Sequence, residues 1–212
     1  AKILAKAVNC EHPVNGDPCC QCPSCLGLES GSFLDVLELD AASNNGVDQV
    51  RALRDEAIYA PANVKKRVYI VDEVHMLSTA AFNALLKILE EPPAHLMFIL
   101  ATTELHKVPA TILSRCQRYS FKRILPKDIA RRLTYVAQQE QIDLTPDGAE
   151  LLSRLADGAL RDGLSLLDQC AAAGGTVDSR AVLEVLGLAG NLQTAQLMRD
   201  ILDRNAQAAL LL

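Results

Sequence analysis

Apolar positions follow two different patterns along this chain, one in each half. In the first half, short runs rich in Val, Ile and Leu alternate with segments whose apolar residues recur every three or four positions. The runs are typical of buried strands, and the longer spacing is typical of helices with one buried face. The predicted strands are Val36–Asp40, Val68–Val71, Phe98–Ala101 and Tyr119–Phe121. Because these strands alternate with helices, the pattern predicts an α/β fold with a parallel sheet.

Helical spacing accounts for most of the remaining chain. Ser78 is suited to cap a helix that Pro92 and Pro93 end, and Thr145-Pro146 is a typical helix start. In the first half the predicted helices are Ala1–Val8, Val47–Ile58, Thr79–Glu90 and Pro109–Leu113. After about Ile124 the strand signal disappears, and the predicted helices are Lys127–Gln139, Pro146–Ala156, Leu160–Ala172, Ser179–Leu186 and a further helical unit from Leu192 to Leu212.

Composition excludes several classes of protein. The 212 residues are 50% hydrophobic and carry a net charge of −5, so nothing marks the chain as a whole as a nucleic-acid binder. Any DNA contact would need a local basic surface; Lys87 and Lys107 are candidates, although a solvated helix face explains them equally well. No apolar stretch is long enough to span a bilayer, and no secretory signal is present. Seven cysteines without such a signal indicate a reducing compartment, so we expect a cytoplasmic protein.

Four of the cysteines have the spacing of a metal site. Cys10, Cys19, Cys22 and Cys25 form a C-x8-C-x2-C-x2-C pattern, which can close a tetrahedral thiolate site around Zn²⁺. A site with four protein ligands leaves no position for water, so the zinc would be structural. The surrounding Gly and Pro residues predict a metal-clipped loop rather than a helix. Cys20 lies outside the pattern and is expected to be a bystander.

Two adjacent acids end the most apolar of the predicted strands. Asp72 and Glu73 follow Val68–Val71 directly, at the edge of an open α/β sheet where ligands bind. In nucleotide hydrolases such a first acid holds Mg²⁺ on the phosphates, and the second is placed to polarise an attacking water. His75 follows closely, but a lone histidine on a strand-to-helix turn is more often structural, and we leave it out of the predicted site.

Several longer segments resemble one family in chain order. The segments are Val68–Met76 (VYIVDEVHM), Asn83–Pro93 (NALLKILEEPP), Leu100–Thr103 (LATT), Ser114-Arg115-Cys116 and Gly158–Gln169 (GALRDGLSLLDQ). Together they resemble the AAA+ clamp-loader ATPases, and the cysteine pattern narrows the resemblance to the gamma/tau type of bacterial DNA polymerase III. This resemblance implies a parallel-sheet AAA+ domain with a zinc module, then a helical lid domain and the start of a helical collar. The implied boundaries are 1–124 (zinc module 10–25), 125–187 and 188–212.

The resemblance also implies roles for individual residues. Asp72 and Glu73 correspond to the Walker B pair of the family, which binds ATP with Mg²⁺. Thr102 or Thr103 corresponds to sensor 1, which reads the γ-phosphate. Arg161 corresponds to the sensor 2 arginine of the lid, and Arg115 to the arginine finger that reaches the ATP of an adjacent subunit. Taken without the resemblance, both arginines read as ordinary surface residues.

One expected motif does not occur in the sequence. No G-x-x-x-x-G-K-[ST] is present, so the phosphate-cradling loop and its lysine are missing. Ala1–Val8 resembles the helix that follows this loop in the family, and we therefore expect an internal piece of a longer chain. As given, the chain is expected to bind ATP poorly and to hydrolyse none.

The resemblance implies a function and partners. The intact protein would be a clamp-loader ATPase of the replicative DNA polymerase III holoenzyme. It would assemble with delta, delta-prime and further gamma/tau subunits, the sliding clamp and primed DNA, without a membrane. One alternative is an ATPase-inactive stator of the delta-prime type, which would not need Asp72 and Glu73. Another is a DNA-binding zinc module, against which the net charge of −5 and the lack of interleaved aromatic and basic residues argue.

Overall fold

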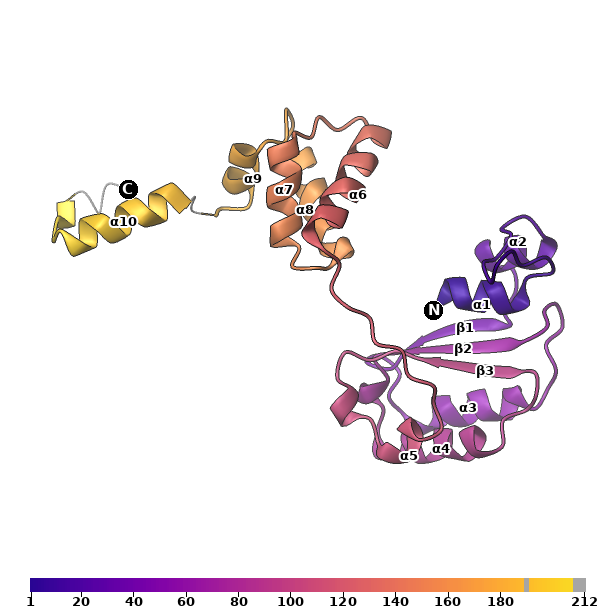
Figure 1. Cartoon of the computed structure of the whole chain (residues 1–212). Helices are drawn as coiled ribbons and strands as arrows, with labels where there is room; N and C mark the ends of the chain where they lie inside the picture. The colour runs from indigo at the N-terminus through magenta and orange to yellow at the C-terminus, as the bar shows by residue number, and fades with distance from the viewer. Residues whose placement is uncertain (189–190, 208–212) are drawn as a thin grey trace. The chain divides into compact units, whose positions relative to one another are not determined.

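The computed structural model describes residues 1–188 and 191–207, and the chain divides into two compact units, 1–119 and 120–212 (Figure 1). Unit 1 holds the sheet and the cysteines, and unit 2 is helical. Each unit has its own apolar core, and each is described by itself. Among the described residues, no helix combines the length and the apolar character that crossing a membrane requires.

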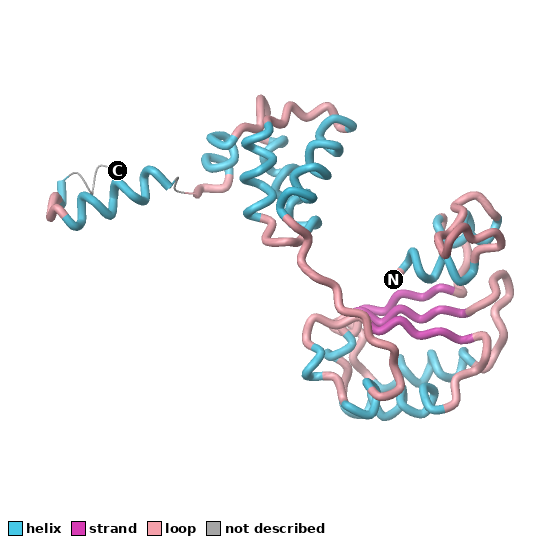
Figure 2. The backbone as a smooth tube through the Cα atoms, viewed as in Figure 1, coloured by secondary structure: helices cyan, strands magenta, loops and turns pink. Residues whose placement is uncertain are grey.

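A parallel three-stranded sheet forms the centre of unit 1 (Figures 1 and 2). Its strands β1 (Val36–Asp40), β2 (Arg67–Asp72) and β3 (Leu96–Leu100) lie in the order β1-β2-β3. All four apolar residues of β2 are buried, because this strand has a neighbour on each side and helices on each face. The register brings the last residue of β1 opposite the last residue of β2.

Helices cover both faces of this sheet. On one face, α3 (Val47–Ala57) and α4 (Thr79–Glu90) pack against Tyr69 and Val71 of β2. On the other face, α1 (Lys2–Asn9) packs through Ala5 against Val68 and Ile70. Alternate residues of β2 therefore serve two separate cores, as the period of a strand requires. The α/β fold with a parallel sheet is confirmed.

Local sequence explains where these helices begin and end. The hydroxyl of Ser78 accepts the backbone N–H of Ala81 at 3.2 Å, so α4 begins where the capping pattern predicts. This helix ends at Glu90, shortly before Pro92, because a proline restricts the residue that precedes it. The remaining short elements of unit 1 are α2 (Pro23–Glu29), η1 (Val74–Met76), η2 (Leu105–Lys107) and α5 (Ala110–Leu113).

The predicted fourth strand, Tyr119–Phe121, is wrong. Figure 2 draws the stretch between α5 and α6 as a loop, and the side chains of Tyr119 and Phe121 are 72% and 95% exposed. A strand needs a neighbour with free backbone groups and a face to bury. Within the described residues, no strand pairs with this segment, and three residues further on the N–H of Ile124 donates to the carbonyl of Gly158 at 3.1 Å.

The cysteine segment also differs from its prediction as a loop, because its last part is α2. Pro23 occupies the first turn of this helix, where its missing N–H costs nothing. The sulfur of Cys22 accepts the backbone N–H of Cys25 at 3.4 Å and so caps the helix. The sequence prediction missed α2 because cysteine is not an expected capping residue.

Four helices form the core of unit 2: α6 (Pro126–Gln139), α7 (Pro146–Leu155), α8 (Leu160–Ala172) and α9 (Ser179–Val185). Their buried side chains include Ile129, Leu133, Leu152, Leu167 and Val182. A further helix, α10 (Asn191–Leu202), follows as predicted, whereas the predicted continuation to Leu210–Leu212 lies outside the described residues. The predicted α-helical second half is confirmed over the described part of the chain.

Asp147 joins two of these helices. Its Oδ2 accepts the backbone N–H of Ser179 at 3.0 Å, which ties the start of α7 to the start of α9. Hydrogen bonds from Ser179 and Thr145 hold the pKa of Asp147 well below its ordinary range. A carboxyl whose pKa is lower in the folded state stabilises the fold above its unfolded pKa, and this contribution is lost as the pH falls.

We therefore expect acid to weaken unit 2 through this residue. The melting temperature should be highest above about pH 5 and should fall as Asp147 is protonated at lower pH. Asp147→Asn should lower the melting temperature at pH 7 by a few degrees and flatten its dependence on acid. Asp168→Asn, at an exposed aspartate of α8, is the matched control and should change neither. Melting temperatures measured by circular dichroism between pH 2 and pH 7 test this expectation. The same dependence of melting temperature on pH for Asp147→Asn and the wild type would contradict it.

Candidate functional site

The carboxyl ends of the three strands meet at one edge of the sheet. Asp40 ends β1, Asp72 ends β2, and Ala101 follows β3. The carboxylate of Asp40 is engaged locally: hydrogen bonds from the Ser43 hydroxyl and the Ala42 amide hold its pKa below its ordinary value. Asp72 is exposed, and among the described residues its carboxylate accepts one hydrogen bond, from the N–H of Glu73 at 3.0 Å. Asp72 is therefore the acid at this edge that remains open to a ligand.

Glu73 turns the chain beneath the end of β3. Its φ of +46° is left-handed, an uncommon conformation for a residue with a side chain. After this turn the N–H of Val74 donates to the carbonyl of Ala101 at 2.9 Å. The carboxylate Oε2 of Glu73 then accepts two hydrogen bonds from Thr103, from the backbone N–H at 3.2 Å and from the hydroxyl at 3.0 Å. The predicted acid and a predicted threonine thus lie in direct contact.

His75, which the sequence analysis left out, also lies in this cluster. Its side chain is only 7% exposed, and its Nδ1 is 3.0 Å from the hydroxyl of Thr102 and 3.3 Å from Oε2 of Glu73. Its Nε2 is 3.1 Å from Oε2 of Glu104. Lys107 lies 2.6 Å from the same oxygen, and its hydrogen bond lowers the pKa of Glu104. The only signal in the sequence was the position of His75 in the turn, two residues after Glu73.

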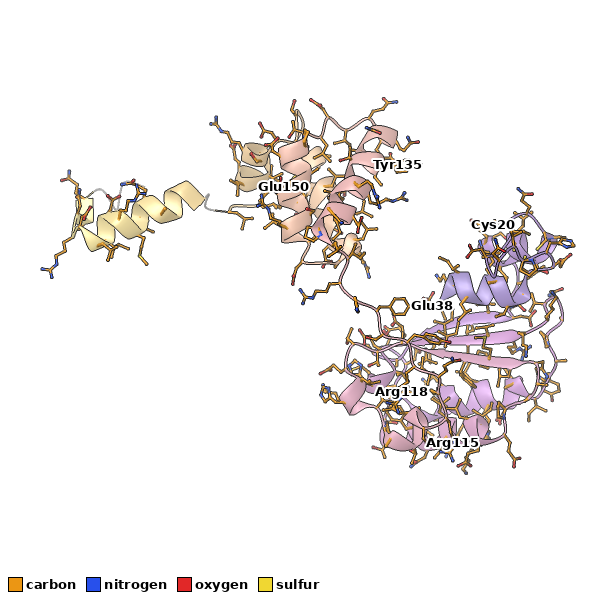
Figure 3. All side chains as sticks on the ribbon, viewed as in Figure 1. Cys20, Glu38, Arg115, Arg118, Tyr135 and Glu150 are labelled. Carbon is orange, nitrogen blue, oxygen red and sulfur yellow. The ribbon has the colours of Figure 1, made fainter. Side chains whose placement is uncertain are left out.

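Within unit 1, Arg115 does not join this cluster. It follows α5, where its guanidinium is 2.9 Å from Oε1 of Glu90 and donates to the carbonyl of Thr111 at 2.9 Å. Figure 3 shows Arg115 beside α4 and α5. Arg161 belongs to unit 2, where it is exposed in the first turn of α8. The geometry of unit 1 therefore brings together Asp72, Glu73 and both threonines.

The four predicted cysteine ligands do come together. Their sulfur atoms all lie within 4.8 Å of one another, and Cys10, Cys22 and Cys25 are buried. Backbone N–H groups point at the sulfurs: Cys19 donates to Cys10 at 3.3 Å, and Cys22 donates to Cys19 at 3.3 Å. Such donors lower the pKa of the thiols of Cys10 and Cys22, whereas burial raises that of Cys25. Four sulfurs in this arrangement can hold a metal ion.

Cys20 does not join the cysteine cluster. It is exposed, and its thiol lies 3.6 Å from the carbonyl of Pro18 (Figure 3). Its φ of +57° turns the backbone between Cys19 and Cys22. Its position therefore agrees with the prediction that Cys20 is not one of the metal ligands.

Asn9 fixes the cysteine segment to the sheet. It is fully buried, and its amide group bonds both backbone groups of Lys66: Oδ1 accepts the N–H at 2.7 Å, and Nδ2 donates to the carbonyl at 3.0 Å. Lys65 donates from Nζ to the carbonyl of Cys10 at 2.6 Å. Both lysines directly precede β2, so the cluster is attached to the end of β2 opposite Asp72.

Comparison with known proteins gives matches over both units. A family model described as "DNA polymerase III, delta subunit" matches residues 1–125, and one described as "DNA polymerase III clamp loader subunit, ATPase lid domain" matches residues 128–176. DNA polymerase III subunit tau of Bacillus subtilis is 50% identical over 211 residues, which are 99% of this chain and 38% of that protein. DNA polymerase III subunit tau of Escherichia coli is 44% identical over 213 residues, 100% of this chain and 33% of that protein.

The chain therefore spans between 33% and 38% of the length of these two relatives. Among solved structures, the RuvB Holliday junction branch migration motor of Thermotoga maritima superimposes with a TM-score of 0.61. The alignment covers 89% of this chain and 68% of that one, at 15% identity. At this identity the match supports the fold alone. It agrees with the predicted AAA+ architecture, and the lid-domain match agrees with the predicted helical lid.

Proposed function

This chain belongs to the family of DNA polymerase III clamp-loader subunits, and on that basis we propose that the intact protein is a clamp-loader ATPase. The observation that carries the proposal is the contact between Glu73 and Thr103 beside the open carboxylate of Asp72. It places an acid suited to activating water against the threonines that follow the neighbouring strand. A stator without ATPase activity has no need of this arrangement.

The proposed roles are those that the family resemblance implies for each residue. Asp72 binds Mg²⁺ on the phosphates of ATP, and Glu73 polarises the attacking water. Thr102 or Thr103, after β3, reads the γ-phosphate. Arg161 in α8 contacts the phosphates bound by its own subunit, and Arg115 reaches the ATP of a neighbouring subunit. A guanidinium placed there stabilises the charge that develops during phosphoryl transfer.

The proposed partners are those of a clamp loader. ATP binding orders a ring with the delta, delta-prime and further gamma/tau subunits, and the ring opens the sliding clamp and places it on primed DNA. Hydrolysis then releases the clamp. The assembly acts in the cytoplasm.

The delta-prime type of stator is the second candidate function. Two observations favour it: the family model over residues 1–125 is described as a delta subunit, and the sequence contains no G-x-x-x-x-G-K-[ST] motif. The sequence upstream of Ala1 distinguishes the two candidates, because an ATPase requires a phosphate-binding loop there.

We further propose that the cysteine cluster binds structural Zn²⁺. Four thiolates are a preferred ligand set for this ion, and Zn–S bonds of about 2.3 Å require sulfur separations of about 3.8 Å. The observed upper limit of 4.8 Å leaves only a small closure of the cluster. The hydrogen bonds from backbone N–H groups to three of the sulfurs support the thiolate form.

Elemental analysis should find one zinc per chain in protein purified without chelators. Cys22→Ser should lower the zinc content, because it removes a buried ligand. Cys20→Ser is the matched control and should keep one zinc, since Cys20 lies outside the cluster. Removal of zinc should increase hydrogen exchange in residues 10–25 more than in the sheet. Protein free of zinc from the start would refute the site.

Nucleotide turnover should depend on residues beyond this chain. The 212 residues alone should bind ATP weakly and hydrolyse none, because no phosphate-binding loop accompanies Asp72 and Glu73. In the intact protein, Glu73→Gln should preserve ATP binding and lower hydrolysis by about 10²- to 10⁴-fold. Glu38→Gln, at a carboxylate of β1 that is paired with Lys2, is the control and should retain turnover (Figure 3). Measured turnover by the 212-residue chain would show the first expectation to be wrong.

Arg115 should act on the ATP of a neighbouring subunit. Arg115→Ala should leave the nucleotide affinity of a lone intact subunit unchanged and should lower hydrolysis in the assembly by about 10³-fold. The control is Arg118→Ala, which removes a nearby arginine whose hydrogen bond to the Leu113 carbonyl is long, 3.5 Å. Figure 3 labels both arginines.

A mixing experiment tests whether this action crosses the interface. Assemblies that contain both Arg115→Ala and Glu73→Gln subunits should regain hydrolysis that neither variant supports alone. The reason is that some interfaces then combine an intact Glu73 with an intact Arg115 from the neighbour. Loss of nucleotide affinity in a lone Arg115→Ala subunit would instead place the arginine in its own site.

A further inference from the structure

His75 connects the turn after β2 to the loop after β3 through both of its ring nitrogens. Nδ1 lies 3.0 Å from the hydroxyl of Thr102, after β3, and 3.3 Å from Oε2 of Glu73, after β2. Nε2 lies 3.1 Å from Oε2 of Glu104, at the start of η2. With a side chain that is 7% exposed, the ring is a buried bridge rather than a surface residue.

The hydrogen bonds of the imidazole depend on which of its nitrogens carry a proton. A carboxylate oxygen only accepts, so the contact with Glu73 is a hydrogen bond when Nδ1–H donates, and the contact with Glu104 is one when Nε2–H donates. The hydroxyl of Thr102 accepts the N–H of Glu104 at 3.0 Å and can still bond to Nδ1, as donor or as acceptor. Nδ1–H is therefore the form in which the ring joins Thr102 to Glu73.

As a result, only one of the two carboxylate oxygens of Glu73 is held by neighbouring groups. Its Oε2 meets two donors from Thr103 and lies beside Nδ1 of His75. Its Oε1 has no hydrogen-bond partner among the residues that the structure describes. One oxygen is thus anchored, and the other is left to meet a water molecule.

From this geometry we propose that His75 is a positioning residue for ATP hydrolysis, which rests on the ATPase function proposed above. It holds Glu73 in the orientation that activates water, and it links Glu73 to Thr102, which reads the γ-phosphate. Because one ring contacts both, a movement of Thr102 is transmitted to the water-activating carboxylate. His75 itself contacts neither nucleotide nor water.

His95 shows what an ordinary structural histidine looks like in the same unit. Its Nε2 makes one hydrogen bond, 2.9 Å long, to the backbone carbonyl of Ala57. The groups that contact the ring nitrogens of His75, by contrast, are all side chains: two predicted site residues and Glu104, which Lys107 in turn holds. This difference in partners separates a positioning role from simple support of the backbone.

Three substitutions at His75 test the proposal in the intact protein. His75→Ala should lower kcat about 10- to 100-fold with little change in KM for ATP, because the carboxylate loses its orientation and the binding groups remain. His75→Asn keeps a polar group near the place of Nδ1 and should recover most of kcat. His75→Gln keeps one near the place of Nε2 and should not. The expected order of kcat is wild type, then Asn, then Gln and Ala together.

His106→Ala is the matched control. This histidine lies in η2, two residues after Glu104, but its side chain is 76% exposed and its Nε2 is 4.0 Å from the Glu104 carboxylate. The substitution His106→Ala should leave kcat unchanged. A value of kcat for His75→Gln equal to or above that for His75→Asn would overturn the proposal, because the bridge to Glu73 and Thr102 runs through Nδ1.

A second measurement needs no nucleotide. If His75 and Thr102 share a bond, the falls in melting temperature caused by His75→Ala and Thr102→Val should not add in the double variant. Additive falls would overturn the proposal.

The ATPase function is tested separately by Glu73→Gln. If Glu73→Gln loses hydrolysis while His75→Ala keeps it, only the role of His75 is wrong; if the wild type and Glu73→Gln are equally inactive, both proposals fall.

Discussion

The parallel pairing of β2 with a strand on each side is the constraint on which the rest of unit 1 depends. Parallel strands run in one direction, so their carboxyl ends collect at one edge of the sheet. Here that edge receives Asp40, Asp72 and the threonines after β3. A slip of one residue in register would turn Val68 and Ile70 away from α1 and toward α3 and α4. The two cores therefore fix the register, and the register fixes which carboxylates meet.

The left-handed turn at Glu73 converts this alignment into a site. A residue with a side chain in this conformation costs about 1–2 kcal/mol. Two hydrogen bonds oppose the cost: the N–H of Glu73 donates to its neighbour Asp72, and the N–H of Val74 donates to Ala101. The turn continues the β2–β3 pairing past the end of the strands. It also swings the carboxylate of Glu73 toward Thr103, which a continuing strand would not do.

The sequence was most informative where local chemistry decides the structure. The helix Thr79–Glu90 has the predicted bounds, because the capping serine, the prolines and the apolar spacing agree there. The helix Leu160–Ala172 also has the predicted bounds, from its apolar spacing alone. The cysteine spacing likewise predicted which four sulfurs come together. Tyr119–Phe121 failed because a strand depends on a partner that its own residues do not reveal.

His75 was missed for a related reason. Its three contacts come from Glu73, Thr102 and Glu104, and the positions of Thr102 and Glu104 are set by the pairing of β3 with β2. A short-range pattern cannot report a contact between residues 75 and 102. The helix after Cys22 was missed for a local reason instead, since a cysteine sulfur took the capping role that Ser or Asp usually fills.

The two ends of β2 hold two different features of unit 1, the cysteine segment and the acids of the ligand edge. At the amino end, Asn9 bonds both backbone groups of Lys66 and so anchors the cysteine segment. At the other end, six residues later, Asp72 and Glu73 face the ligand edge. A strand of this length spans about 20 Å, too far for the cysteine cluster to contact a ligand at that edge. The structural zinc site proposed for the cysteines fits this place in the fold, because a structural site needs no contact with the ligand edge.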